Sequence, residues 1–158
     1  DSCDHKSFPR IDPAVIVLVH RGEHCLLGRQ ATWPEGRFST IAGFVEPGES
    51  LEDAVAREVQ EETNIRVGEC RYIASQPWPF PAAMMLGFHA EALSEDIRFN
   101  DGELQEARWL TRQAIRAGAI GLPPRESIAF QLIEHWFDSD KGEPLASLGL
   151  DSPMFRRP

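Results

Sequence analysis

A continuous run of branched apolar residues, AVIVLVH at positions 14–20, places the strongest limit on the fold of this chain. A strand with one face in water would show a polar residue at every second position, and this run does not. We therefore expect a central strand that is covered on both faces. Because helix patterns alternate with the other strand patterns, the sequence predicts a layered α/β domain.

The remaining patterns predict further strands at residues 25–29, 38–46, 65–75, 83–92 and 107–110, and helices at residues 50–63, 111–117 and 127–137. Pro77, Pro79 and Pro81 predict an irregular segment between two of these strands, because proline has no backbone N–H to donate. A length of 158 residues suits one domain. Weak signals after Asp138 predict a C-terminal tail over residues 139–158.

The formal net charge of −9 argues against a broad nucleic-acid surface, which requires an excess of Lys and Arg. An acidic protein can still bind a phosphate substrate when divalent cations lie between the two. No apolar run is long enough to span a membrane, and no secretion signal opens the chain. Three scattered cysteines, Cys3, Cys25 and Cys70, do not form a disulfide framework, so we expect a cytoplasmic location.

The stretch AREVQEET at positions 56–63 concentrates carboxylates at the end of a predicted helix. At about 100° per residue, Glu58, Glu61 and Glu62 fall within an arc of roughly 100°. A solvated helix face is the simplest interpretation. However, this helix contains no Lys, and acids near a helix C-terminus oppose the helix dipole. A hard divalent cation such as Mg²⁺ or Mn²⁺ would relieve both penalties.

The spacing around this helix resembles the Nudix box. Gly43 is followed after five residues by Glu49 and after seven more by the run REVQEE, and the match extends over residues 43–65 with Asn64 in place of the usual Gly. In that family the box is a loop–helix–loop that holds Mg²⁺ or Mn²⁺ against a nucleoside-linked diphosphate. The resemblance implies a Nudix fold, an α/β/α sandwich around a mixed β-sheet, over residues 14–138.

The resemblance also implies roles for individual residues. It implies five metal ligands, which are Ala42 through its carbonyl, Glu58, Glu61, Glu62 and Glu103. Glu58, Glu61 and Glu62 are implied to be catalytic, with Glu61 as the candidate general base. Structural roles fall to Gly43, which lets the backbone approach the metal, and to Arg57, which is expected to pair with Glu49. A solvent-facing Arg57 and a solvated Glu103 are the simpler alternatives.

A second motif, SQPWPFP at positions 75–81, presents aromatic side chains on a stiff segment. It can be interpreted as a rigid connection whose aromatic residues cover the edge of the core, or as a polyproline ligand for a partner. Downstream of the Nudix box it resembles the signature of the NADH pyrophosphatase family, with Ala83 in place of a usual Ser. Substrate-binding residues are then expected at Phe8, Phe44, Gln76 and Trp78.

The resemblance further suggests that the chain is either a catalytic domain from a longer protein or a family member that has lost its zinc ribbon. Family members carry a four-cysteine zinc ribbon before this domain, and residues 1–13 resemble a remnant of its linker, with Cys3 as the last ligand. Since one cysteine cannot close a structural zinc site, zinc is not expected in this chain. Family members often pair, so a homodimer is expected.

The reaction implied is metal-dependent hydrolysis of the diphosphate of NADH, giving reduced nicotinamide mononucleotide and AMP. The same chemistry could remove an NAD cap from the 5′ end of RNA or hydrolyse ADP-ribose. A dinucleotide sensor without turnover is a further alternative, which the intact set of Glu58, Glu61 and Glu62 argues against.

Overall fold

A computed structural model describes residue 6 and residues 8–100 and 102–150. The strands are β1 (Asp12–Arg21), β2 (His24–Arg29), β3 (Ile41–Phe44), β4 (Val67–Trp78), β5 (Ala83–Ala92) and β6 (Glu106–Thr111). The helices are α1 (Leu51–Thr63), α2 (Arg112–Arg116) and α3 (Ile128–Phe137), followed by a short 3₁₀ turn, η1 (Leu145–Ser147).

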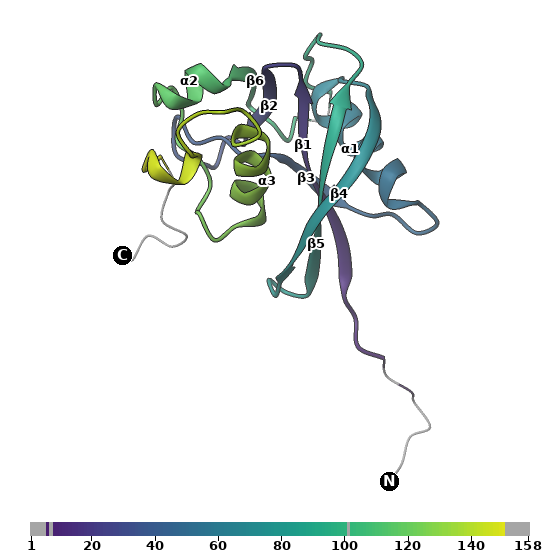
Figure 1. The fold of residues 1–158 in the computed structure, drawn as a ribbon. Coiled ribbons are helices and arrows are strands. Elements are labelled where there is room, and N and C mark those ends of the chain that lie inside the picture. Colours follow the sequence, from purple (N-terminus) through teal and green to yellow (C-terminus); the bar gives the residue numbers. More distant parts are fainter. Residues whose placement is uncertain (1–5, 7, 101, 151–158) are drawn as a thin grey trace.

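The strands form one mixed sheet in the order β4-β5-β1-β2-β6, with β3 paired to β1 beside β2. The β1–β5 pair is parallel and the other pairs are antiparallel. Helix α1 covers one face of the sheet, and α3 covers the other (Figure 1). The predicted α/β/α sandwich around a mixed sheet is confirmed.

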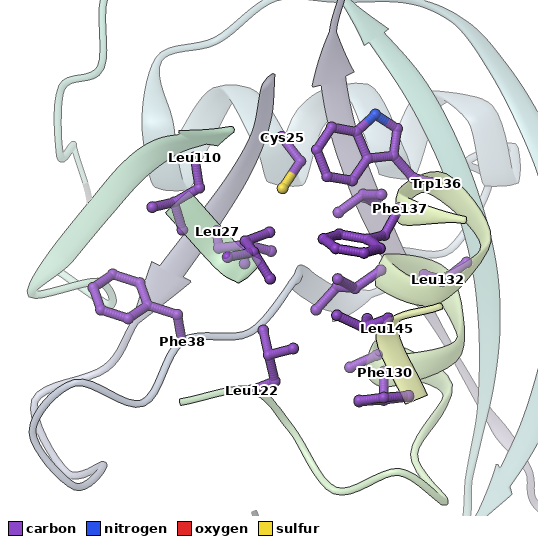
Figure 2. Close-up of a cluster of buried hydrophobic side chains, with 14 of the residues drawn as sticks. Cys25, Leu27, Phe38, Leu110, Leu122, Phe130, Leu132, Trp136, Phe137 and Leu145 are labelled. Atoms are coloured by element: carbon purple, nitrogen blue, oxygen red, sulfur yellow. The ribbon is translucent and has the colours of Figure 1, made fainter. Parts of the chain in front are cut away.

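Strand β1 lies at the centre of this sandwich, and residues 14–19 are all buried. Its side chains alternate between two cores. Ile16 and Leu18 pack into the core beneath α3, whereas Val15, Val17 and Val19 pack into the core beneath α1. Figure 2 shows the α3 core, in which large side chains of α3 meet residues of β2 and β6. The expectation of a strand covered on both faces is therefore confirmed.

Helix α1 begins and ends as its sequence predicts. The hydroxyl of Ser50 accepts a hydrogen bond from the backbone N–H of Asp53 at 3.1 Å, which satisfies one of the free donors at the helix start. Asn64 ends the helix in the left-handed conformation, with φ of 63°. The buried face of α1 consists of Ala54, Val55, Val59, Thr63 and one charged residue, Glu62.

The proline-rich segment departs from the prediction. Strand β4 does not stop before Pro77 but continues through it to Trp78, and Pro77 lies opposite Met84 of β5. Because β4 is the last strand of the sheet, a residue without an N–H is tolerated on its outer side. The predicted irregular segment is thus shorter than expected, and Gln76 and Trp78 lie on a strand.

Several other expectations concern the ends and the surroundings of the chain. Cys25 and Cys70 are free thiols, and Cys3 lies outside the described residues. Within residues 139–150 of the predicted tail, Leu145 is buried in the α3 core. Among the helices of the described part, none combines the length and apolar character needed to cross a bilayer.

Candidate active site

Helix α1 presents its three glutamates in different environments. The side chain of Glu58 is 13% exposed and that of Glu61 is 53% exposed. Glu62 is buried, with 4% of its surface exposed. Glu58 and Glu62 lie one turn apart on the same side of the helix, as their spacing requires. Glu103 lies on the exposed connection between β5 and β6.

The loop before α1 is held to the helix by an ion pair. Arg57 donates from Nε to Oε1 of Glu49 at 2.7 Å and from Nη2 to Oε2 at 3.0 Å, a bidentate arrangement. Arg57 Nη2 also donates to the carbonyl of Phe44 at 2.9 Å. Hydrogen bonds from Arg57, and a further one from the backbone N–H of Glu46, lower the pKa of Glu49 to about 2. The structure thus brings Arg57 and Glu49 together.

The same guanidinium also contacts the acidic face. Arg57 Nη1 lies 2.8 Å from Oε1 of Glu58 and 3.1 Å from Oε2 of Glu61. Burial raises the pKa of Glu58, the hydrogen bond from Arg57 opposes that rise, and the nearby charges of Glu61 and Glu103 add to it. One cation therefore offsets part of the repulsion among clustered carboxylates.

Gly43 gives the carboxylate of Glu58 its place on the sheet. A Cβ atom at Gly43 would lie 1.9 Å from Cδ of Glu58 and 2.1 Å from each carboxylate oxygen. The carboxylate thus lies directly against the β3 backbone, in a space that only a glycine leaves open. Ala42, whose carbonyl was the predicted backbone ligand, directly precedes Gly43 on the same strand.

The donor chemistry of these residues fits a hard divalent cation. Carboxylate and carbonyl oxygens are the donors that Mg²⁺ and Mn²⁺ prefer, and the space over Gly43 holds one such carboxylate. Within residues 6, 8–100 and 102–150, no three His, Cys, Asp or Glu side chains converge in a geometry that would hold one ion. Since Arg57 bridges Glu58 and Glu61, metal binding has to compete with this guanidinium.

A cavity of about 350 Å³ opens beside this site. Its size falls within the range of small-ligand pockets. Aromatic and aliphatic side chains, including Trp33, Phe38 and Trp78, form much of its wall. Glu62 and Ala42 also line it, so the cavity extends to the acidic end of α1. A largely apolar cavity with the carboxylate of Glu62 in its wall suits a ligand with a ring at one end and phosphate at the other.

The four predicted substrate-binding residues fall into two groups. Gln76 and Trp78 line the cavity, and the ring of Trp78 meets Phe80 edge to face at a centroid distance of 5.4 Å. Phe8 is 80% exposed and Phe44 is 59% exposed, and neither lines the cavity. A contact of Phe8 or Phe44 with substrate stays a prediction.

Sequence reasoning missed most of the cavity wall. Residues that it did not single out are Trp33, Arg37, Thr40, Leu104, Pro124 and Ser127. They come from three separate segments, residues 33–40, residue 104 and residues 124–127, so no single local spacing connects them. The one available signal was Ser127, whose hydroxyl caps α3, and that signal marks a helix start rather than a binding site.

A mixed sheet between helices, with a carboxylate-bearing loop–helix unit beside a ligand-sized cavity, defines the hydrolase class to which the Nudix box belongs. The family model described as NUDIX domain matches residues 10–134, and the chain belongs to this family. The resemblance noted in the sequence is therefore confirmed.

The relatives point to a group within the family. The chain is 47% identical over 139 residues to the human protein named NAD-capped RNA hydrolase NUDT12, a match that covers 82% of this chain and 30% of that protein. It is 51% identical over 146 residues to NAD-capped RNA hydrolase NudC of Mycobacterium bovis, covering 84% and 47%. The chain thus spans less than half the length of these curated relatives.

A solved structure agrees on the fold. The crystal structure of a NUDIX hydrolase from Nitrosomonas europaea matches with a TM-score of 0.69 and 26% identity, over 87% of this chain and 77% of that one.

Proposed function

We propose that this chain hydrolyses the diphosphate of NAD(H), releasing nicotinamide mononucleotide and AMP. The observation that carries the proposal is the cavity itself, whose apolar, tryptophan-bearing wall extends to Glu62. Such a shape suits a nicotinamide or adenine ring in the apolar part and a diphosphate at the carboxylates. The names of the relatives, both NAD-capped RNA hydrolases, support the same substrate class.

The carboxylates of α1 and Glu103, with the carbonyl of Ala42, would hold Mg²⁺ or Mn²⁺. Such ions, when bound, neutralise phosphate charge and lower the pKa of a coordinated water. The protein contributes placement: Gly43 gives Glu58 its position, and Arg57 fixes the loop through Glu49. Glu61, which is half exposed and bonded to Arg57, is the candidate general base.

Removal of an NAD cap from RNA is the second candidate, and the names of the relatives favour it. The cavity volume of about 350 Å³ suits a terminal nucleoside rather than a polymer. A net charge of −9 disfavours long contacts with the RNA body. A capped RNA would therefore be recognised mainly through its NAD end.

From the resemblance to the NADH pyrophosphatase family we also propose a homodimer and a cytoplasmic location.

The test of the reaction is Glu58→Gln. We expect this variant to fold normally and to lose at least about a hundredfold in metal-dependent NADH cleavage, because an amide is a poorer ligand for Mg²⁺ than a carboxylate. Glu52→Gln is the matched control, since Glu52 is an exposed glutamate in the first turn of the same helix. Full turnover by Glu58→Gln would exclude the proposed role.

The substrate class is tested separately, by comparing kcat/KM for NADH, NAD⁺, ADP-ribose and an NAD-capped RNA with one preparation of the wild-type chain. We expect NADH or the capped RNA to be the best substrate. A clear preference for ADP-ribose would reject the assignment while leaving the metal chemistry intact.

A further inference from the structure

The start of α3 forms one wall of the cavity, through Ser127, Ile128 and Ala129. The first N–H groups of a helix have no partner within the helix. The hydroxyl of Ser127 accepts from the N–H of Phe130 at 3.2 Å. The N–H of Ile128 instead donates to Oε1 of Gln76 at 2.8 Å, so a side chain from β4 completes the cap of this helix.

The other end of the Gln76 amide is also engaged. Its Nε2 donates to the carbonyl of Glu126 at 2.8 Å. An N–H requires an acceptor and a carbonyl requires a donor, so the two partners fix which way the amide points. Both bonds connect the edge strand to the turn that leads into α3, about fifty residues further along the chain.

Gly87 of β5 lies at the same contact between the β4–β5 pair and the start of α3. A Cβ atom at Gly87 would lie 2.8 Å from Cδ1 of Ile128 and 3.1 Å from the carbonyl oxygen of Ala74. Ile128 is 3% exposed, so its side chain fills the space that Gly87 leaves. The β4–β5 pair therefore sets the position of the α3 start twice, once through the Gln76 amide and once through this close packing.

We propose that Gln76 is a positioning residue, which fixes the α3 wall of the substrate cavity, rather than a direct ligand of the substrate. Sequence resemblance implied a substrate contact for Gln76. Although Gln76 lines the cavity, each end of its amide already has a backbone partner, and a substrate would have to share those atoms. The kinetic part of this inference rests on the proposed function, whereas the hydrogen-bonding part does not.

The test compares Gln76→Met, which removes both hydrogen bonds at similar length, with Gln76→Glu, which retains only an acceptor for Ile128. Gln131→Glu is the matched control, because Gln131 is exposed on the same helix. Amide hydrogen exchange at Ile128 measures directly whether the helix cap is intact. KM and kcat for NADH measure whether the α3 wall of the cavity still binds the substrate. Tryptophan fluorescence, through Trp33 and Trp78, reports binding of nicotinamide mononucleotide and AMP without turnover.

In Gln76→Met we expect exchange at the Ile128 amide to rise about tenfold, while exchange at Leu132, in the middle of α3, stays unchanged. We expect KM to rise about tenfold and kcat to stay within about twofold, because the wall binds the substrate but does not touch the reacting phosphate. Gln76→Glu should fall between wild type and Gln76→Met, and Gln131→Glu should match wild type.

A rise in KM without faster exchange at Ile128 would show that Gln76 binds the substrate directly, and would overturn the proposal. Faster exchange with unchanged KM would also overturn it, because the cap would then not control the cavity. If the wild-type chain does not cleave NAD(H), the proposed function fails, and the fluorescence titration takes the place of KM. If Gln76→Met does not fold, Gln76→Glu tests the loss of the bond to Glu126 alone, and an unchanged KM in that variant would overturn the proposal.

Discussion

Replacing Gly43 with alanine fills the space that Glu58 occupies in the active site but leaves the backbone conformation unchanged. Gly43 is not among the residues with positive φ in the described chain, so alanine can adopt the same backbone angles. The three atoms nearest to the new Cβ all belong to the carboxylate of Glu58, whose Cδ would lie 1.9 Å away. The substitution therefore acts on one side chain of the site and not on the fold.

The size of the effect follows from that distance. Ordinary van der Waals contact begins at 3.4 Å, so the carboxylate of Glu58 must retreat by about 1.5 Å. A displacement of about 1 Å in a catalytic group can lower the rate about a hundredfold, which corresponds to about 2.7 kcal/mol. The free energy of unfolding should change by less than about 1 kcal/mol, because alanine restricts the unfolded chain and Glu58 can move.

The assay measures kcat/KM for metal-dependent NADH cleavage, Mn²⁺ affinity by calorimetry and urea unfolding, all for Gly43→Ala. Gly22→Ala is the control, in which we expect stability to fall and activity to stay unchanged. Gly22 lies in the β1–β2 turn with φ of 55° and has no atom within 4 Å of its would-be Cβ. It should lose about 1–2 kcal/mol of stability and keep its activity. Wild-type activity in Gly43→Ala would refute the placement of Glu58 over β3.

Two further predictions concern titration. Glu49 should stay ionised until the pH falls to about 2, and Arg57→Lys should move its pKa back toward the ordinary value because lysine cannot bond both carboxylate oxygens, as carboxyl NMR would show. Burial lowers the pKa of His89 to about 4. Between about pH 6.5 and pH 4 the imidazole is therefore protonated in the unfolded chain but neutral in the native state. The protein should lose up to about 3 kcal/mol of stability as the pH falls through this range. Urea unfolding across this range should show a flatter profile for His89→Gln, and an equally steep one would assign the loss to another group, such as His20, whose ring contacts His89 and whose pKa burial also lowers.

Those parts of the fold that depend on local pattern could be predicted from the sequence. The apolar run at positions 14–19 required two cores, and Ser50 and Asn64 set the limits of α1 through their own caps. Strand β4 was misjudged because the effect of Pro77 depends on whether its strand lies at the edge of the sheet. Strand order is a tertiary property, and one sequence does not reveal it.

The acidic part of the site was equally accessible, because fixed spacing on one helix places Glu58 and Glu62 on one side. The contacts of Arg57 with both Glu58 and Glu61 were not predicted, since they depend on the side-chain conformation and not on the spacing. The residues of the cavity wall could not be predicted for a different reason. Its members meet only after the sheet has formed, as the bond between Gln76 and Ile128 illustrates.

The geometry of β3 explains why the cavity and the carboxylates of α1 meet at this strand. Successive side chains of a strand point to opposite faces of the sheet. At Ala42 the strand lines the cavity, and at Gly43, the next residue, it lies beneath the carboxylate of Glu58 from α1. A ligand with its ring in the cavity can therefore bring its phosphates to the acidic helix beside the β3 backbone at these two residues. We expect the bond cleaved in the proposed reaction to lie there, so a single methyl group at Gly43 should lower the rate about a hundredfold without disturbing the fold.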